Sequence, residues 1–194
     1  MTRIIAGSAG GTTLDVPSAG TRPTSDRVRE SLFGALESAD LLAGARVADL
    51  FAGSGALGLE AASRGAASVD LVEHSAPAVT LIRRNADRVT KAGGFATPLR
   101  THRATVNTFL RGAGVGAFDL VFLDPPYDLP DAELTETLLA LAPRLSTDAT
   151  VVVERAKRSA APEWEAAHLA PLRHRVYGDT AMWWGQPRPA SQSR

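Results

Sequence analysis

Short apolar runs alternate along this chain with longer stretches in which apolar residues recur every three or four positions. The short runs have the length and composition of buried strands, and the longer stretches have the spacing of one apolar helix face. Strands are expected near residues 46–51, 68–73, 96–103, 118–123 and 149–154. Helices are expected between them, ending at Gly65, starting at Ser75, spanning Val106 to Arg111 and bearing Leu134, Leu138 and Leu141. This alternation predicts an α/β fold with a doubly wound, mostly parallel sheet.

The N-terminal residues precede this alternation and have a pattern of their own. Two strand-like segments, at residues 3–7 and 12–16, flank a glycine-rich stretch and predict a β-hairpin. A helix is then expected to start near Thr24 or Ser25. The doubly wound sheet does not need these elements, so residues 1–40 are expected to form an N-terminal extension.

The C-terminal residues are expected to complete the sheet. After the last buried strand we expect a helix near Trp164 and then two strands, at 172–177 and 180–184, joined by a tight turn. The two strands would form an antiparallel hairpin at one edge, which brings the sheet to seven strands. Residues 41–186 would then form one Rossmann-like domain, and residues 187–194 a flexible tail.

A glycine-rich turn follows the first strand of the expected sheet, in the sequence Asp49-Leu-Phe-Ala-Gly53-Ser-Gly55-Ala-Leu-Gly58. Glycines let the backbone approach a nucleotide, and the helix that follows offers free N–H groups at its start. Glu73 ends the next strand, 20 residues after Gly53, which is about the offset of a carboxylate that binds a ribose diol. These features predict a nucleotide cofactor, and they fit NAD as well as S-adenosylmethionine (SAM).

A second motif, Asp124-Pro125-Pro126-Tyr127, closes the apolar run at 118–123. The two prolines lack N–H donors and fix φ, so this turn is stiff and presents a carboxylate and carbonyl oxygens as acceptors. Tyr127 adds a ring on which a base can stack. This combination suits an amino group on a flat ring.

Three observations favour SAM over NAD. Asp49 stands four residues before Gly53, where an acid would repel a pyrophosphate but suit the positively charged methionine end of SAM. Asp124-Pro125-Pro126-Tyr127 belongs at the carboxyl end of a neighbouring strand, beside the cofactor crevice. At 194 residues the chain is also short for a second domain that would hold a substrate for hydride transfer.

The two motifs together resemble those of SAM-dependent methyltransferases that act on exocyclic amino nitrogens of nucleobases. Arg3-Ile-Ile-Ala-Gly7 and the segment from Thr21 to Phe33, with Glu154 and Tyr177-Gly-Asp-Thr180, extend the resemblance over nearly the whole chain. They are similar to the RsmD family, bacterial methyltransferases that modify N2 of one guanine in small-subunit ribosomal RNA. One segment departs from this pattern: Thr105-Val-Asn-Thr-Phe109-Leu carries Thr105 where such enzymes often have an acid.

This resemblance assigns roles to individual residues. The catalytic turn is expected to comprise Asp124, Pro125, Pro126 and Tyr127. The SAM site is expected to comprise Asp49, Phe51, Gly53, Ser54, Gly55, Gly58, Glu73, Thr105 and Val106. Phosphates of the RNA are expected to contact Arg3, Arg22, Arg27 and Arg29. The implied substrate is 16S rRNA, within a 30S particle or an assembly intermediate.

Composition narrows the chemistry and the setting. The chain has no cysteine, which excludes methyl transfer through a cysteine nucleophile, and its four histidines lack metal-ligand spacing. No bound metal is therefore expected. No long apolar span or signal peptide is evident, so a cytoplasmic location is expected. We also expect a monomer. The formal net charge is zero, yet residues 83–103 are rich in arginine, and the charged residues within 119–136 are all acidic. This asymmetry would orient a polyanion, although a solvated helix face explains the basic cluster equally well.

Other functions remain open at this point. A DNA adenine-N6 methyltransferase uses the same kind of motif, although the chain shows no added target-recognition domain. An NAD-dependent oxidoreductase would fit the glycine turn and Glu73 alone. An RNA-binding protein without activity would retain the basic residues but has no need of both motifs.

Overall fold

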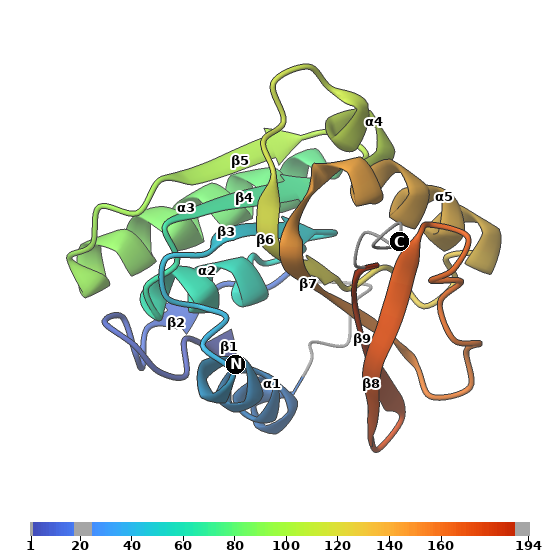
Figure 1. Ribbon diagram of the computed structural model, residues 1–194. Helices are drawn as coiled ribbons and strands as arrows, with labels where there is room; N and C mark the ends of the chain where they lie inside the picture. The colour runs from blue at the N-terminus through green and yellow to red at the C-terminus, as the bar shows by residue number, and fades with distance from the viewer. Residues whose placement is uncertain (1, 18–24, 189–194) are drawn as a thin grey trace.

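The computed structural model describes residues 2–17 and 25–188, and Arg22 lies outside these ranges. Figure 1 shows the elements in chain order. They are β1 (Thr2–Arg3), β2 (Thr13–Leu14), α1 (Asp26–Ser38), β3 (Arg46–Leu50), α2 (Ala56–Ser63), β4 (Ser68–Glu73), α3 (Ala76–Gly93), β5 (Leu99–Arg103), α4 (Val106–Arg111), β6 (Phe118–Leu123), α5 (Asp131–Leu141), the 3₁₀ turn η1 (Ala142–Arg144), β7 (Leu145–Ala156), β8 (Leu169–Tyr177) and β9 (Thr180–Pro187).

The main sheet has seven strands in the order β5-β4-β3-β6-β7-β9-β8. The first five strands are parallel, whereas β9 runs antiparallel to both β7 and β8. The doubly wound sheet with an antiparallel hairpin at one edge, predicted from the sequence, is therefore confirmed. The chain winds outward from β3 to β5 and then returns to β6 on the other side of β3. The carboxyl ends of β3 and β6 are thus neighbours, which is where α/β sheets bind ligands.

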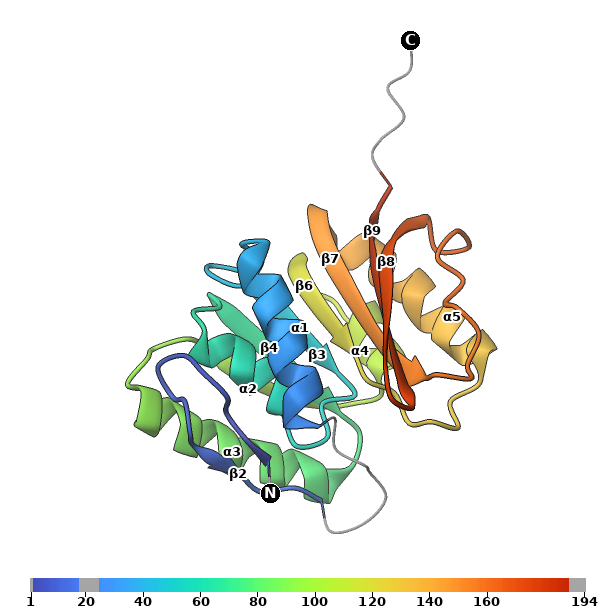
Figure 2. The same ribbon diagram turned by 90° about the horizontal axis from the view of Figure 1, so that it is seen from below.

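Helices cover both faces of the sheet (Figure 2), and an apolar cluster lies between the sheet and each helical layer. One contains side chains of α1, α2 and α3, and the other contains side chains of α4 and α5. The central strands supply residues to both clusters alternately, as Val121 and Phe122 do on β6. This burial on both faces explains why the central strands read as continuous apolar runs.

The N-terminal extension is tied to α2. The Glu60 carboxylate, fully buried on α2, accepts hydrogen bonds from the backbone N–H groups of Ile5 and Ala6 at 2.7 and 3.0 Å. Ser63 Oγ donates to the Ala6 carbonyl at 2.7 Å. Gly7 packs so closely that a Cβ there would lie 2.0 Å from the Ser63 carbonyl oxygen. The segment of residues 4–9 is therefore joined to α2, and its Ile4 and Ala9 side chains belong to the same apolar cluster as α1, α2 and α3.

The expected helix near Trp164 is wrong. Residues 157–168 form turns, and the Trp164 ring packs against Gly185 of β9, where a Cβ would lie 2.5 Å from a ring carbon. The backbone N–H of Trp164 donates to the Pro162 carbonyl, and the Trp164 carbonyl accepts the backbone N–H of Leu169. Backbone hydrogen bonds therefore hold the turn before and after Trp164. The segment lacks the repeated apolar positions that a packed helix face needs.

The C-terminal strands are longer than the sequence predicts. β7 starts at Leu145 rather than near residue 149, and a register shift against β6 between Phe118 and Leu120 accommodates the extra residues. β9 continues to Pro187, and the Arg188 guanidinium donates to the Leu169 carbonyl at 3.2 Å. The expected tail is therefore wrong for residues 187–188, and residues 189–194 lie outside the described ranges.

Candidate active site

The glycine turn after β3 adopts a left-handed backbone conformation that favours glycine. Phe51, Gly53 and Gly55 all have positive φ, at 66°, 56° and 79°. Gly55 is the N-cap of α2, and Gly58 lies one turn later where α2 crosses β4. A Cβ on Gly58 would lie 2.7 Å from Leu71 Cδ2, so this glycine lets the helix approach the sheet. Phe51 has the same left-handed conformation although it carries a side chain, so its backbone is strained, and such strain is typical of functional sites.

Asp49 is buried, with 1% of its surface exposed, and Oδ2 accepts the Gly58 N–H at 2.8 Å. The pKa of Asp49 is raised to about 7, mainly by burial and in smaller part by the nearby Glu73 carboxylate, although the hydrogen bond from Gly58 acts to lower it. Asp49 therefore fastens the start of α2 to β3. Its expected contact with the methionine end of SAM stays a prediction.

Glu73 closes the turn from the neighbouring strand. Its two carboxylate oxygens accept the N–H groups of Gly53 at 3.1 Å and Ser75 at 2.8 Å. His74 Nδ1 lies 3.1 Å from Glu73 Oε1. The Ser54 carbonyl is held separately, by Asn85 Nδ2 at 2.9 Å. The glycine turn and the acid 20 residues later are thus brought together as the motif predicts.

A pocket of about 330 Å³ opens beside Glu73. Among the residues expected to bind SAM, Phe51, Glu73, Thr105 and Val106 line it. Asp49, Gly53, Ser54, Gly55 and Gly58 do not line it and form the turn and helix start beside it. The sequence did not single out the other lining residues, which are Val72, His74, Ala104, Asn107, Leu129, Glu133 and Thr137.

Thr105 and Asn107 form the wall where the resemblance predicts an acid. Thr105 is the N-cap of α4, and its Oγ1 accepts the Thr108 N–H at 3.2 Å. Asn107 Oδ1 is buried and has no hydrogen-bond partner among the described residues. Asn107 lines the pocket, so this unpartnered acceptor belongs to the pocket wall. The pocket therefore fits the nucleoside part of SAM.

The turn Asp124–Tyr127 lies between this pocket and a second hollow. Asp124, half-buried, directly follows β6 at the carboxyl edge of the sheet, and Pro125 is buried. Pro126 lines the pocket beside Glu73. Tyr127, 52% exposed, lines a cleft of about 640 Å³ instead. Adjacent residues of one stiff turn thus face two different cavities.

The second hollow, here called the substrate cleft, runs between α1 and the β8–β9 turn. Its lining residues are Ser25, Arg27, Val28 and Ser31 of α1 and its cap, Tyr127, and the segment from Val176 to Thr180. A hydrogen bond of 2.9 Å between Ser31 Oγ and the Tyr177 hydroxyl joins the two walls. The N-terminal extension therefore builds one wall of the cleft that Tyr127 enters.

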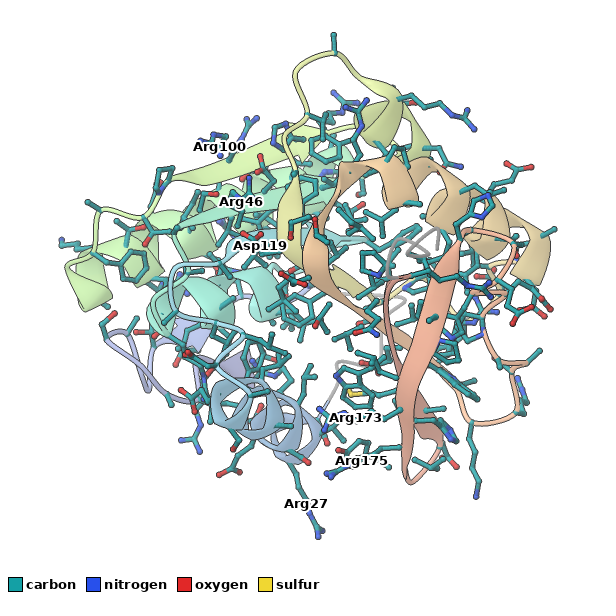
Figure 3. All side chains as sticks on the ribbon, in the orientation of Figure 1. Arg27, Arg46, Arg100, Asp119, Arg173 and Arg175 are labelled. Atoms are coloured by element: carbon teal, nitrogen blue, oxygen red, sulfur yellow. The ribbon has the colours of Figure 1, made fainter. Side chains whose placement is uncertain are left out.

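The arginines expected to bind RNA divide into different environments. Arg27 is exposed and lines the substrate cleft, and Figure 3 shows it pointing outward from α1. Arg3 is also exposed and lies 3.7 Å from Asp26. Arg22 lies outside the described residues. Arg29 is 1% exposed, so its expected phosphate contact is wrong.

Arg29 instead holds the extension together. Its guanidinium donates to the Arg3 carbonyl and to Asp26 Oδ1, both at 2.7 Å, and lies 3.9 Å from Glu60. A signal for this burial existed in the sequence. Arg29 stands four residues before Phe33 and seven before Leu36, on the apolar stripe of α1.

The other charged clusters are neutralised in part by partners. On the basic stretch, Arg84 and Arg88 pair with Asp15, each at 3.2 Å, and Arg100 lies 3.5 Å from Asp70. On the acidic stretch, Arg46 donates to both oxygens of Asp119 and holds the pKa of that carboxyl well below its usual range. Figure 3 shows Arg46 and Arg100 far from Arg27.

Known proteins resemble this chain in sequence and in architecture. The model of a family described as "Conserved hypothetical protein 95" matches residues 2–186. Over 180 residues, the chain is 38% identical to "Ribosomal RNA small subunit methyltransferase D" of Escherichia coli (strain K12), covering 92% of this chain and 86% of that protein. The chain belongs to this family, the RsmD family. The expected family, fold class and SAM dependence are thereby confirmed.

Further members and solved structures agree with the RsmD assignment. The "Putative rRNA methyltransferase YlbH" of Bacillus subtilis (strain 168) is 32% identical, covering 93% of this chain and 96% of that protein. The solved structure of a "Putative methyltransferase yhhF from Escherichia coli" is 35% identical, with a TM-score of 0.78 over 97% of this chain and 98% of that chain. A "putative RNA methyltransferase" from Pyrococcus horikoshii, at 19% identity and a TM-score of 0.70, shares the fold.

Two kinds of feature are absent from the described residues. Within residues 2–17 and 25–188, no helix is long and apolar enough to cross a membrane. Within the same ranges, no group of three or more His, Cys, Asp or Glu side chains is placed to hold a metal ion.

Proposed function

We propose that this RsmD-family enzyme transfers a methyl group from SAM to the exocyclic N2 of a specific guanine in 16S rRNA. One observation carries the proposal: Pro126 faces the pocket beside Glu73, and Tyr127, the next residue, faces the substrate cleft. A base stacked on Tyr127 would meet a cofactor held in the pocket at Asp124. The names of the relatives support ribosomal RNA as the substrate.

The pocket residues would hold SAM through different groups. Glu73 would accept hydrogen bonds from the ribose hydroxyls, since a carboxylate accepts such bonds strongly. Phe51 and Val106 would contact the adenine ring, and Asn107 Oδ1 would accept from its amino group. When bound, SAM supplies a methyl group already activated by its sulfonium. As the bond from N2 to the methyl carbon forms, the sulfur–methyl bond breaks, S-adenosylhomocysteine leaves, and N2 releases one proton to water. The protein therefore has to position the acceptor nitrogen.

Asp124 and the Pro125 carbonyl would provide that positioning. The guanine amino lone pair is delocalised into the ring, so the nitrogen is a weak nucleophile. Accepting its N–H bonds localises electron density on the nitrogen and orients it, and near-attack orientation can supply roughly 7–11 kcal/mol of a barrier. Stacking on Tyr127, worth about 1–3 kcal/mol, would offset much of the few kcal/mol needed to unstack the base.

Nucleoside mass spectrometry tests this proposal. Small ribosomal particles that lack the modification are incubated with the protein and SAM, and their nucleosides are analysed for N2-methylguanosine. Asp124→Ala should abolish its formation while SAM affinity, measured by calorimetry, changes little. Appearance of N6-methyladenosine, or N6-methyladenine formed in duplex DNA, would contradict guanine N2 as the target. Loss of SAM binding together with activity would assign Asp124 to the cofactor site or the fold.

The setting follows from the substrate. An enzyme that modifies 16S rRNA acts where small subunits are assembled, which in a bacterium is the cytoplasm. The two forms of substrate, naked rRNA and a protein-bearing particle, are distinguished by repeating the assay with each.

A further inference from the structure

Two hollows meet at Tyr127. The substrate cleft lies on one side, and another hollow, of about 530 Å³, lies on the other. Tyr127 and Asp179 line both, while Lys157 and Arg158 line only the second. The β8–β9 turn therefore forms a ridge with Tyr127 beside it and a hollow on each flank.

The cleft flank carries two arginines that sequence analysis did not single out. Tyr177 of β8 bonds Ser31 of α1, so the face of β8 that carries Tyr177 points to α1. Because side chains alternate along a strand, Arg175 and Arg173 lie on that same face. Figure 3 shows both beside α1, on the side where Arg27 projects.

The edge position of β8 keeps these arginines accessible. β8 is the last strand of the sheet, and both side chains are exposed. The Arg173 guanidinium carbon lies 4.3 Å from the centre of the Trp184 ring, a cation–π contact that orients the guanidinium on one face while the residue stays exposed. Together with Arg27, these residues place three cations on the α1 side of the ridge.

The opposite flank carries a matching charge. Lys157 and Arg158 follow β7 directly and are exposed. The Lys157 N–H donates to the Asp179 carbonyl at 2.7 Å, which fixes this segment to the β8–β9 turn. Of the described residues that line the two hollows, only Asp179 carries a carboxylate. Both flanks are therefore net positive.

We propose that the RNA strand on either side of the target nucleotide crosses the β8–β9 ridge. Arg27, Arg173 and Arg175 contact phosphates on one flank, and Lys157 and Arg158 contact phosphates on the other. Such contacts fix the register of the strand without reading its sequence, and the base between them is delivered to Tyr127. This inference rests on the proposed function for the identity of the substrate.

These proposed phosphate contacts are here called the RNA track. The salt dependence of RNA binding tests the track directly. The probe is a single-stranded oligoribonucleotide with the sequence around the methylated guanine, titrated at several salt concentrations without SAM. Each lost phosphate contact lowers the slope of log affinity against log salt by about 0.7 for a single strand. The double variants R173Q/R175Q and K157Q/R158Q should therefore each lower it by about 1.4. Glutamine keeps much of the side-chain stem, and melting temperatures verify folding.

The matched control is R83Q/K91Q, which removes two exposed cations from α3. Its slope should equal that of the unchanged protein. With ribosomal particles as substrate, both track variants should raise KM and leave SAM affinity unchanged, whereas the control should do neither. Unchanged slopes in folded track variants, or an equal drop in the control, would overturn the track.

The binding assay keeps this inference separate from the proposed function. If the track variants lose salt dependence but the unchanged protein forms no N2-methylguanosine, the track stands and the reaction is wrong. If methylation occurs and the slopes do not change, the reaction stands and the track is wrong.

Discussion

Glu73 combines a structural and a ligand-binding task in one carboxylate. It accepts two backbone N–H groups of its own chain and lines the pocket assigned to SAM. A hydrogen bond that involves a charged group is worth about 1.5–3 kcal/mol. Glu73→Ala should therefore weaken SAM binding roughly ten- to a hundredfold, as measured by calorimetry.

Glu73→Gln is the control for this change. It keeps one acceptor oxygen and the shape of the side chain, so it should lose less affinity than Glu73→Ala. Comparison of melting temperatures separates ligand contacts from loss of the bond to Gly53. Unchanged SAM affinity in a folded Glu73→Ala variant would remove Glu73 from the cofactor site.

Asp49 gives the stability of the protein a pH dependence. Its pKa is about 7 in the folded chain, against 3.8 as the ordinary value. Between these values the folded state holds a proton that the unfolded chain releases, so the free energy of unfolding falls as pH rises from about 4 to about 7. The fall is at most about 1.4 kcal/mol per pH unit, and it stops above pH 7.

Asp49→Asn should remove this contribution. The amide oxygen can still accept the Gly58 N–H, and there is no charge to bury. The variant should therefore gain stability over the unchanged protein as pH rises toward 7, in urea unfolding measured at pH 4.5, 6 and 8. Parallel pH profiles for the two proteins would show that Asp49 has an ordinary pKa.

At the scale of elements, the contact between α2 and β4 depends on the missing side chain of Gly58. Alanine has a higher helix propensity than glycine by about 1 kcal/mol. Its Cβ, however, would lie 2.7 Å from Leu71 Cδ2 and 2.9 Å from Val69 Cγ1, and overpacking typically costs about 1–3 kcal/mol. The packing cost should win, so Gly58→Ala should lower the free energy of unfolding in urea.

Gly34→Ala is the matched control. Gly34 is an exposed position within α1, and a Cβ there would meet nothing within 4 Å. This change should stabilise the protein by about 0.5–1 kcal/mol. If both alanines stabilise, the close approach of α2 to the sheet is not limiting.

The elements also show what periodicity can and cannot predict. β3, β4 and β6 were found from the sequence because burial on both faces makes these strands mostly apolar, with one internal aspartate in each. Trp164 gave a false signal, since one large apolar residue packs as well from a turn as from a helix. Arg29 was assigned to the surface because a charged residue is rarely buried, although it lies on the apolar stripe of α1.

The residues around the motifs were harder to predict. Asn107 stands beside the position where the family pattern expects an acid, and Arg175 occurs in a segment without a motif, so their importance comes from what the fold brings near them. The wall built by Ser31 and Tyr177 joins residues 146 positions apart. Local patterns carry no information about such a contact, whereas the glycine turn and Glu73 were predictable because a known motif fixes their separation.

At the scale of the molecule, one core joins the extension to the sheet. Ile4, Phe33 and Leu36 belong to the same apolar cluster as strand residues of the sheet, and the Phe33 and Phe122 rings lie 5.6 Å apart. Calorimetry should therefore show a single unfolding transition, with equal calorimetric and van't Hoff enthalpies. Two separable transitions would show instead that residues 1–40 fold independently.

The strand order has a consequence for how the enzyme is completed during synthesis. β8 is joined to the rest of the sheet through β9, which is the last strand made. A growing chain can therefore assemble β3 to β7 and the pocket beside Glu73 before the wall that carries Arg173 and Arg175 has anything to pair with. The nascent protein would become able to bind its donor first and to grip its substrate only after residue 187 has left the ribosome.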